Sequence, residues 1–325
     1  MKFSPVYQFN AKVNQWIIHQ TDASIPSPDS FKILTFNVLF DTWWGKPHKD
    51  HIICSLERFK HQFNVFKELD ADLIALNEVT PNYIHRIIQE KWVQDSYYIS
   101  DSSGATINNF GNLILSKFPI KELSFVTLPQ LKRPVPCAKI HFKNQPLIIA
   151  ATHLSAQKEN IERRQLQINE LTHFLHQYYP KEDKIILGDL NYHIEQEIVP
   201  KAYQDAWESI HSNKKGYTFD GTINTMIHEM WPLAWVYGFK DDVQMRLDRI
   251  LTQLYHWQPS TIDVCLNTPI YKAQSTPNII KDIISTIFDR FKLNLARSPK
   301  HYLFPSDHFG LIATFTALNP PPTKT

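Results

Sequence analysis

The chain has 325 residues, 43% of them hydrophobic, and a formal net charge of +2 at pH 7. This length and composition are sufficient for a large apolar core in one or two domains. Because the overall charge is weak, any binding to a nucleic acid must come from a local basic surface. With only 8 glycines, and neither a GxxxxGKS/T nor a GxGxxG run, the chain is not expected to form a glycine-rich phosphate loop.

The cysteines, the hydropathy pattern and the N-terminus bear on the compartment. Cys54, Cys137 and Cys265 lie far apart and match no metal-binding spacing or disulfide framework, which favours a reducing compartment. No apolar segment is long enough to span a bilayer, and the N-terminal residues lack the apolar stretch of a signal peptide. We expect an intracellular protein, cytoplasmic or nuclear, that does not insert into membranes, and we expect it to act as a monomer.

In chain order, an N-terminal segment precedes a long region of alternating strands and helices. Within residues 1–30, the part from Val6 to Ile18 is predicted to pack as an edge strand, and Thr21 to Ser30 is predicted to be a linker. Apolar runs and helical stripes of apolar residues then alternate. They predict strands at 31–38, 72–76, 111–116, 137–142, 147–152, 185–187, 246–251 and 309–315, and helices at 55–69, 81–89, 159–178, 198–210 and 278–291.

This alternation has no repeat period and shows no convincing internal boundary. It predicts one large α/β domain over residues 31–318. Within it, residues 266–300 are predicted to be an insertion, and the apolar stripe of its helix is expected to be buried. The proline-rich residues 319–325 are predicted to be a disordered tail.

Polar side chains stand where the predicted strands leave the core. They are Asn37, Glu78, His153, Asp189 with Asn191, and the pair Asp307 and His308. We expect these side chains to gather at one rim of the α/β domain. For the run from Gly188 to Asn191 taken alone, a simple turn explains the residues equally well, because Gly, Asp and Asn are common in turns.

This set of side chains suits the hydrolysis of a phosphate ester. Glu78 is a hard oxygen ligand of the kind that Mg²⁺ uses. Asp189 is suited to orienting or deprotonating a water molecule. The histidines and amides can donate hydrogen bonds to oxygens that gain charge in the transition state. Phosphate transfer to an aspartate is an open alternative, although direct attack by water needs fewer groups.

Six motifs stand in the order of a known superfamily. They are Thr35–Val38, Asn77–Val79, Thr152–Leu154, Gly188–Asn191, Leu247–Ile250 and Ser306–His308. With them the chain resembles the endonuclease/exonuclease/phosphatase superfamily over about residues 31–318. The resemblance implies a four-layered α/β sandwich, in which two packed, mixed β-sheets are flanked by helices. It also implies phosphodiester or phosphomonoester hydrolysis that depends on Mg²⁺ or Mn²⁺.

The resemblance implies a metal centre with an adjacent water site. Glu78 matches the main metal ligand, Asp307 matches an auxiliary acid near the metal, and Asn37 matches the residue that supports the metal and its waters. Asp189 matches the residue that positions the attacking water. Asn191 matches its neighbour that contacts the phosphate.

The remaining motif residues are two histidines, an acid that pairs with one of them, and an asparagine that differs from the family pattern. His153 and His308 resemble the histidines that face the phosphate, and Asp248 resembles the acid that pairs with His308. Asn77 departs from the pattern, because many members carry Gln at this position. The shorter side chain is expected to alter a neighbouring hydrogen bond and to leave the metal ligand Glu78 intact.

Several stretches resemble the branch of 5′-tyrosyl-DNA phosphodiesterases, which remove peptide adducts from DNA 5′ ends. They are Asn77–Tyr83, Tyr217–Asp220, Arg246–Ile250 and Phe304–Leu311. The likeness implies a DNA 5′ end as substrate and a role in DNA repair. It implies substrate contacts for Lys158, for His193 where the branch carries Arg, and for Phe219 where it carries Trp. A Phe ring can still stack on a base, with less area.

Two other functions stay open. An enzyme of this superfamily could act on RNA, on abasic DNA or on a phospholipid head group. The basic and aromatic residues from Lys214 to Phe219 favour a nucleic acid, and no membrane-inserting apolar loop is evident. The domain could also be a catalytically inactive binding module, but every catalytic position carries a competent residue, which favours an enzyme.

Overall fold

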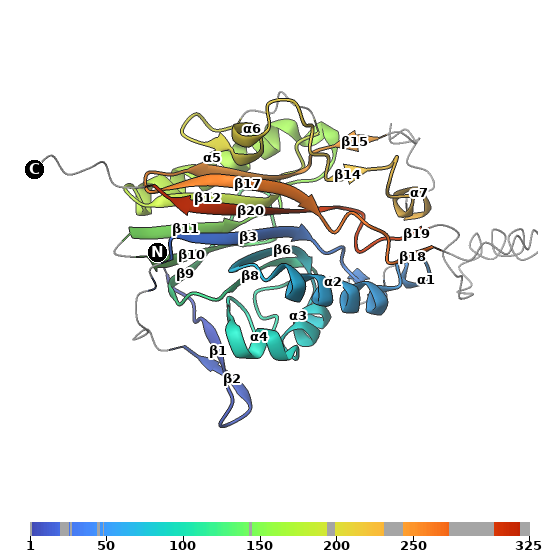
Figure 1. Ribbon diagram of the computed structural model, residues 1–325, viewed down its shortest axis with the longest axis horizontal. Coiled ribbons are helices and arrows are strands. Elements are labelled where there is room, and N and C mark those ends of the chain that lie inside the picture. The colour runs from blue at the N-terminus through green and yellow to red at the C-terminus, as the bar shows by residue number, and fades with distance from the viewer. Residues whose placement is uncertain are drawn as a thin grey trace, which may run out of the picture.

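Two large β-sheets pack against each other, and helices cover the outer face of each sheet (Figure 1). The structure is a computed structural model that describes residues 2–19, 26, 28–43, 46–47, 49–142, 145–193, 199–230, 243–272 and 302–318. Both sheets are mixed. This arrangement confirms the predicted four-layered α/β sandwich.

The larger sheet has eight strands. In spatial order they are β17 (Trp257–Cys265), β20 (Gly310–Ala317), β3 (Ser30–Asn37), β6 (Leu73–Val79), β8 (Gly111–Ser116), β7 (Tyr98–Ile99), β1 (Tyr7–Asn10) and β2 (Gln15–Ile18). Strands β3 and β6 are parallel, whereas β20 and β8 run antiparallel to them. The predicted N-terminal edge strand is a hairpin, β1–β2, that joins the sheet through β7.

The smaller sheet has six strands. In spatial order they are β13 (Gln204–Asp205), β16 (Asp248–Gln253), β12 (Asp183–Asp189), β11 (Gln145–Ala151), β10 (Val135–Phe142) and β9 (Ile120–Val126). Strands β11 and β12 are parallel, and β16 runs antiparallel to β12. Within the described ranges, three two-stranded ribbons lie outside both sheets. They are β4 (Thr42–Trp43) with β5 (Lys46–Pro47), β14 (Phe219–Asp220) with β15 (Gln244–Met245), and β18 (Tyr271–Lys272) with β19 (Tyr302–Leu303).

Within the described residues, helices lie in the two outer layers and along the edges of the sheets. They are α1 (Asp50–Ile53), α2 (Ser55–Leu69), α3 (Pro81–Ile87), α4 (Lys91–Ser96), the 3-10 turn η1 (Lys158–Asn160), α5 (Ile161–Tyr178), α6 (Ala206–Ile210) and α7 (Met226–Met230). Apolar residues of α2, α3 and α4 pack on the larger sheet. Those of α5 pack on the smaller sheet.

An apolar layer between the sheets holds them together. Phe31 and Ile33 of β3 belong to one buried cluster with Ile149 of β11 and with Ile185 and Leu187 of β12. The neighbouring residues of these strands point the other way and pack under the helices. Because both faces of these strands are buried, their sequences are nearly continuous apolar runs.

The strand directions bring polar residues to one rim. We use "the rim" for the edge of the two sheets where β3, β6, β11 and β12 end and where the antiparallel strands β16 and β20 begin. Residues just after the first four strands therefore lie near residues at the start of the last two. The predicted gathering of the motif residues depends on this combination of directions.

Arg58 and Gln62 of α2 connect the chain segment after β3 to the chain segment before β20. Arg58 donates from Nη1 to the carbonyl oxygens of Val38 and Pro305, at 2.8 and 3.0 Å. Gln62 donates from Nε2 to the same two oxygens, at 3.1 and 2.6 Å. Both side chains are fully buried. They tie the segment that follows β3 to the segment that precedes β20.

Most of the predicted elements are present. All eight predicted strands correspond to strands of the two sheets, and α2 has the predicted bounds of 55–69. The predicted helices at 81–89 and 159–178 correspond to α3 and α5. Most of these elements have an apolar run, an apolar stripe or an alternation of apolar and polar residues, which explains why the sequence pattern predicts them.

The predicted helix at 198–210 is wrong over most of its described length. Residues 199–203 are not helical, β13 follows them, and only α6 is a helix. The Tyr203 N–H donates to the Pro200 carbonyl in a turn, and β13 pairs with β16. The side chain of Asp205 accepts from the Trp207 N–H and so caps α6 at its start.

Some predictions concern residues outside the described ranges. These are the helix at 278–291, the tail at 319–325, residues 273–300 of the insertion and most of the linker at 21–30. Among the described helices, none is both long and apolar enough to cross a membrane. All three cysteines are free.

We expect Arg58→Met to destabilise the fold. The change removes charged donors from buried carbonyl oxygens, which should lower the free energy of unfolding by about 3 kcal/mol. For a chain of 325 residues, that corresponds to an unfolding temperature about 4 °C lower. Thermal unfolding followed by circular dichroism measures it, with Lys60→Met on the exposed side of α2 as the control. Equal unfolding temperatures for the two variants would contradict the role given to Arg58.

Candidate active site

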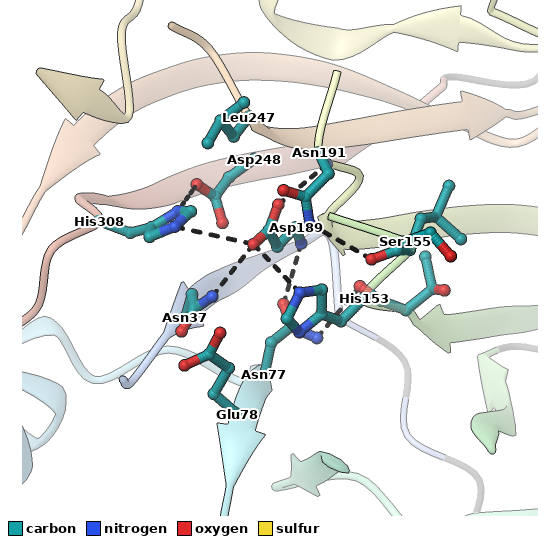
Figure 2. Close-up of polar contacts among 12 residues, drawn as sticks. Asn37, Asn77, Glu78, His153, Ser155, Asp189, Asn191, Leu247, Asp248 and His308 are labelled. Carbon is teal, nitrogen blue, oxygen red and sulfur yellow. Dashed lines mark hydrogen bonds and ion pairs between the residues drawn. The ribbon is translucent and has the colours of Figure 1, made fainter. Parts of the chain in front are cut away.

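Asp189 lies at the centre of the rim (Figure 2). It is the last residue of β12, and only 2% of it is exposed. Asn37, at the end of β3, donates from Nδ2 to Asp189 Oδ2 at 3.1 Å. The Asn191 N–H donates to Asp189 Oδ1 at 2.9 Å. Because β3 and β12 belong to different sheets, the Asp189 carboxylate is held from both.

Two histidines approach the same carboxylate oxygen from different segments. His153 follows β11, and its Nε2 is 3.5 Å from Asp189 Oδ2. His308 precedes β20, and its Nε2 is 3.7 Å from that oxygen. Both distances exceed those of a good hydrogen bond. The imidazoles therefore border Asp189 without being tied to it.

Gly188 allows a close approach between two strand ends. Its φ is +132°, and a Cβ there would lie 2.0 Å from the Thr152 carbonyl oxygen and 2.8 Å from Asn77 Oδ1. Only glycine fits both this backbone conformation and this space. As a result, the backbone that leads to Asp189 packs directly on the backbone that leads to His153.

Asp248 and His308 form a hydrogen-bonded pair. His308 Nδ1 is 2.8 Å from Asp248 Oδ2, which directs Nε2 towards Asp189. Asp248 is the first residue of β16, and its main-chain N–H donates to Thr218 Oγ1 at 3.0 Å. The carbonyl of Thr218 in turn accepts from the Phe309 N–H at 2.6 Å. Thr218 thus connects the two segments that carry the pair.

The two histidines are held in different charge states. Burial lowers the pKa of His153 well below its ordinary value, and the positive charges of Arg133 and His308 lower it further. Burial acts in the same direction on His308, but the carboxylates of Asp248 and Asp189 outweigh it and hold the pKa of His308 well above its ordinary value. Near neutral pH, His153 is neutral and His308 is cationic.

Glu78 occupies an irregular position near the end of β6. Its φ is +60°, and the pairing of β6 with β8 shifts register between Asn77 and Val79. Such a bulge re-aims a side chain, here towards the rim. The Phe40 N–H donates to Glu78 Oε2 at 3.2 Å. Burial, reinforced by repulsion from Asp307, raises the pKa of Glu78 to about 7.

Two groups of side chains at the rim offer metal ligands. Ligand atoms of Asp189, Asp248 and His308 lie within 4.8 Å of one another. Asp248 Oδ2 and His308 Nδ1 already share a hydrogen bond, whereas Asp248 Oδ1 is buried without a hydrogen-bond partner among the described residues. Burial is the main cause of the raised pKa of Glu78, and the nearby Asp307 adds to it, so these two acids form a second group of oxygen ligands. A divalent cation would compensate their charge, and oxygen ligands suit it, so the chemistry favours Glu78 and Asp307.

Arg133 is a charged residue of the rim that the sequence analysis missed. Its Nη2 donates to the carbonyl oxygens of His153 and Leu154, both at 3.3 Å. Its guanidinium lies 4.7 Å from the centre of the Phe110 ring, which in turn lies 5.9 Å from the His153 ring. Arg133 precedes a strand, as Asp307 and His308 do, but stands outside the recognised motifs. It places a positive charge beside His153.

The three predicted substrate-contact residues lie in different surroundings. Phe219 in β14 is 8% exposed, and its ring meets that of His308 edge-on at 5.3 Å. His193 is half-buried, two residues after Asn191. Lys158 is exposed in η1, and within the described part of the chain it makes no hydrogen bond or ion pair with the residues around Asp189. Substrate contact stays a prediction for all three.

The sequence comparison decides the family. Residues 34–308 match the Endonuclease/Exonuclease/phosphatase family. The chain belongs to this family. The matched range contains every motif residue from Asn37 to His308, and it confirms the resemblance found in the sequence. No curated protein matches the sequence of this chain.

Solved structures of the same fold include several TDP2 proteins. C. elegans TDP2 superposes with a TM-score of 0.62 at 19% identity, covering 89% of this chain and 75% of the other. D. rerio TDP2 complexed with a single-strand DNA product gives a TM-score of 0.60 at 18% identity, covering 89% and 100%. The human Nocturnin catalytic domain with bound sulfate gives 0.56 at 15% identity, covering 89% and 94%. At these identities the likeness shows the fold.

We expect Asp248→Asn to impair turnover in a pH-dependent way. The change keeps the shape of the side chain but removes the charge that raises the pKa of His308, so kcat should fall by about 10²- to 10⁴-fold. The loss of activity towards high pH should begin at a lower pH than in the unchanged protein. Kinetics from pH 5 to 9 with a phosphodiester measure both effects.

A matched control for this change is Asp263→Asn, on the exposed side of β17. It should leave kcat and the pH profile unchanged. A kcat for Asp248→Asn within a factor of about three of the unchanged protein would rule out a role for the pair in turnover.

We expect Glu78→Gln to stabilise the metal-free protein at high pH. Because the pKa of Glu78 is raised to about 7, the stability linked to its protonated form is complete below the ordinary value and is lost as the pH rises through 7. The gain in unfolding temperature from Glu78→Gln should therefore be larger at pH 8 than at pH 5. Mg²⁺ should raise the unfolding temperature of the unchanged protein at pH 8, but not that of the variant.

Thermal unfolding in EDTA and in Mg²⁺ tests this expectation. The exposed Glu170→Gln on α5 serves as the control and should behave like the unchanged protein. An equal Mg²⁺ response of all three proteins would show that Glu78 does not hold the cation.

Proposed function

We propose that this protein is a Mg²⁺-dependent phosphodiesterase that hydrolyses phosphate esters at DNA 5′ ends with an activated water molecule. The observation that supports this best is the buried rim, where the Asp189 carboxylate lies between a neutral and a cationic imidazole. Two further carboxylates suited to a cation stand beside it. Membership of the Endonuclease/Exonuclease/phosphatase family supports the same reaction class.

In this proposal the scissile phosphate lies between the two histidines. His308 donates from Nε2 to a phosphate oxygen while Asp248 holds its Nδ1 proton. Neutral His153 donates from the other side, and Asn191 provides a further contact. Fixed donors of this kind stabilise the charge that grows on phosphate oxygens in the transition state. Arg133 adds to the positive potential around them.

Asp189 is assigned to the attacking water. Burial raises its pKa to about 6, so the carboxylate is ionised at neutral pH and is basic enough to take a proton from water. The hydrogen bond from Asn37 fixes the orientation of Oδ2. The water oxygen then bonds to phosphorus, the ester P–O bond breaks, and the leaving oxygen takes up a proton from bulk water. A divalent cation held by Glu78 and Asp307, with Asn37 beside them, would neutralise charge on the phosphate oxygens.

The choice of a DNA 5′ end rests on the motifs and on the structural relatives. Four stretches of the sequence resemble 5′-tyrosyl-DNA phosphodiesterases, and the similar folds include a TDP2 with a single-strand DNA product. Phe219 lies against His308, where it can border a nucleotide next to the phosphate. Lys158 and His193 are proposed as further contacts to the DNA backbone.

We also propose that the protein acts in the cytoplasm or the nucleus, as a monomer, in DNA repair. Its three free cysteines are compatible with a reducing compartment. DNA 5′ ends occur in the nucleus and in other compartments that contain DNA, which is consistent with the proposed compartment.

A panel of four substrates with Mg²⁺ tests the proposed function. It contains a 5′-phosphotyrosyl oligonucleotide, abasic duplex DNA, poly(A) RNA and a phosphoinositide. We expect tyrosine release to be the fastest reaction, to stop in EDTA, and to slow at least about 100-fold in Asp189→Asn. Undiminished activity in EDTA would exclude the metal-dependent mechanism. Faster turnover of another substrate would replace the proposed one, and no turnover at all would favour a binding module.

A further inference from the structure

Asn77 is a motif residue that the proposed mechanism does not use, although it lies fully buried between the two sheets (Figure 2). Its Oδ1 accepts from the Asp189 N–H at 3.0 Å. Its Nδ2 donates to the carbonyl oxygen of Thr152, the residue before His153, at 3.1 Å. One amide from the larger sheet therefore holds the backbone at both strand ends of the smaller sheet that carry Asp189 and His153.

Asn112 completes this arrangement. It is the direct cross-strand neighbour of Asn77 in the pairing of β6 with β8, and it is 1% exposed. Its Oδ1 accepts from Asn77 Nδ2 at 2.8 Å, and its own Nδ2 donates to the Pro134 carbonyl at 3.2 Å. Rotating the Asn77 amide by 180° would set its donor against the Asp189 N–H, so the contacts determine its orientation.

Asn77 also directly precedes Glu78 in the sequence. The bulge in β6 aims Glu78 at the rim while the Asn77 side chain stays between the sheets. The Asn77 side chain and its hydrogen bonds therefore link Glu78 on one sheet to the backbone of Asp189 on the other, beside the link that Asn37 makes to the Asp189 carboxylate. Buried, fully hydrogen-bonded amides of this kind resist displacement, because an unmade bond in the interior costs about 1–3 kcal/mol.

We propose that Asn77 and Asn112 are a pair of positioning residues that together set the separation between Glu78 and the strand ends of Asp189 and His153. The inference rests on the proposed phosphodiesterase function, since it concerns the geometry of that site. Asn112 fills the space that remains beside the short Asn77 side chain and keeps its amide directed at both backbones. This pairing explains how the chain tolerates Asn at position 77.

The space around the pair leaves little tolerance for a longer side chain. The Asn77 amide already lies within 2.8 and 3.1 Å of where a Cβ of Gly188 would stand. Gln at position 77 is longer by one methylene group and would compete with the Asn112 amide for its position. Extra atoms in a packed interior move the backbone. A displacement of about 1 Å at a catalytic site can reduce the rate about 100-fold.

The test is a double-mutant cycle with Asn77→Gln, Asn112→Ser and both changes together. We expect Asn77→Gln to lower kcat for the 5′-phosphotyrosyl oligonucleotide about 10- to 100-fold with KM changed less than about threefold. Asn112→Ser makes room for the longer side chain, so the double variant should recover at least about tenfold of the lost kcat. The exposed Asn64→Gln on α2 is the control and should match the unchanged protein.

Unfolding temperatures of the four proteins are measured in parallel. The same coupling should appear there, with the double variant more stable than Asn77→Gln alone. If Asn77→Gln unfolds at the assay temperature, the single variant Asn112→Ser tests the proposal instead. A kcat of Asn112→Ser equal to that of the unchanged protein would overturn the proposal. Additive effects on kcat in an active enzyme would also overturn it.

Different results would contradict the proposed phosphodiesterase function and the proposed pairing of Asn77 with Asn112. If the unchanged protein hydrolyses no substrate of the panel, the proposed function is wrong, and the coupling in unfolding temperature alone decides whether Asn77 and Asn112 act as a pair. If the unchanged protein is active and the variants show no coupling, the function stands and the pairing is wrong.

Discussion

The packing of the two sheets face to face is the constraint on which the site depends. The buried cluster that contains Phe31, Ile149 and Leu187 fixes how the sheets lie on each other. Glu78 and Asn37 come from the larger sheet, whereas Asp189 and Asp248 come from the smaller one. Neither sheet carries a complete site. Because protein interiors are close-packed, the packing of the apolar layer determines where the polar residues at its edge lie.

Burial of this rim produces its electrostatic character. The carboxyls of Glu78 and Asp189 have raised pKa values because they are removed from water, and the imidazole of His153 is kept neutral for the same reason. Of the two imidazoles, that of His308, beside Asp248, gains enough from its carboxylate neighbours to stay charged. Charged groups with shifted pKa values are costly to a fold, and they concentrate where chemistry takes place. A cation and a phosphate bound here would compensate charges that the protein leaves unbalanced.

Short polar side chains connect the two sheets at the rim. Asn37 reaches Asp189 through one hydrogen bond, and Asn77 reaches the backbone at Asp189 and Thr152 through two. Within the larger sheet, Arg58 joins the chain after β3 to the chain before β20. Such buried groups are satisfied completely or they destabilise the fold. They restrict the rim to one arrangement.

The sequence predicted the regular elements where one signal dominates. The apolar stripe of α2 gave its bounds correctly, since a helix face buried on a sheet needs that spacing. The same reasoning failed at 198–210, because pairing of β13 with β16 and the turn at Pro200 outweigh the local pattern. The short strands of the ribbons were not predicted, because two residues contain too little periodicity.

For the site, the sequence by itself determined which side chains were available and that they stood at strand ends, because residue type and alternation are properties of the chain. It determined the family through the order of six short motifs. Only the tertiary structure decided which strand ends meet, that Arg133 stands beside His153, and that Asn77 and Asn112 bind each other across β6 and β8. These facts depend on contacts between residues far apart in sequence. A local pattern contains no information on such contacts until the sheets are packed.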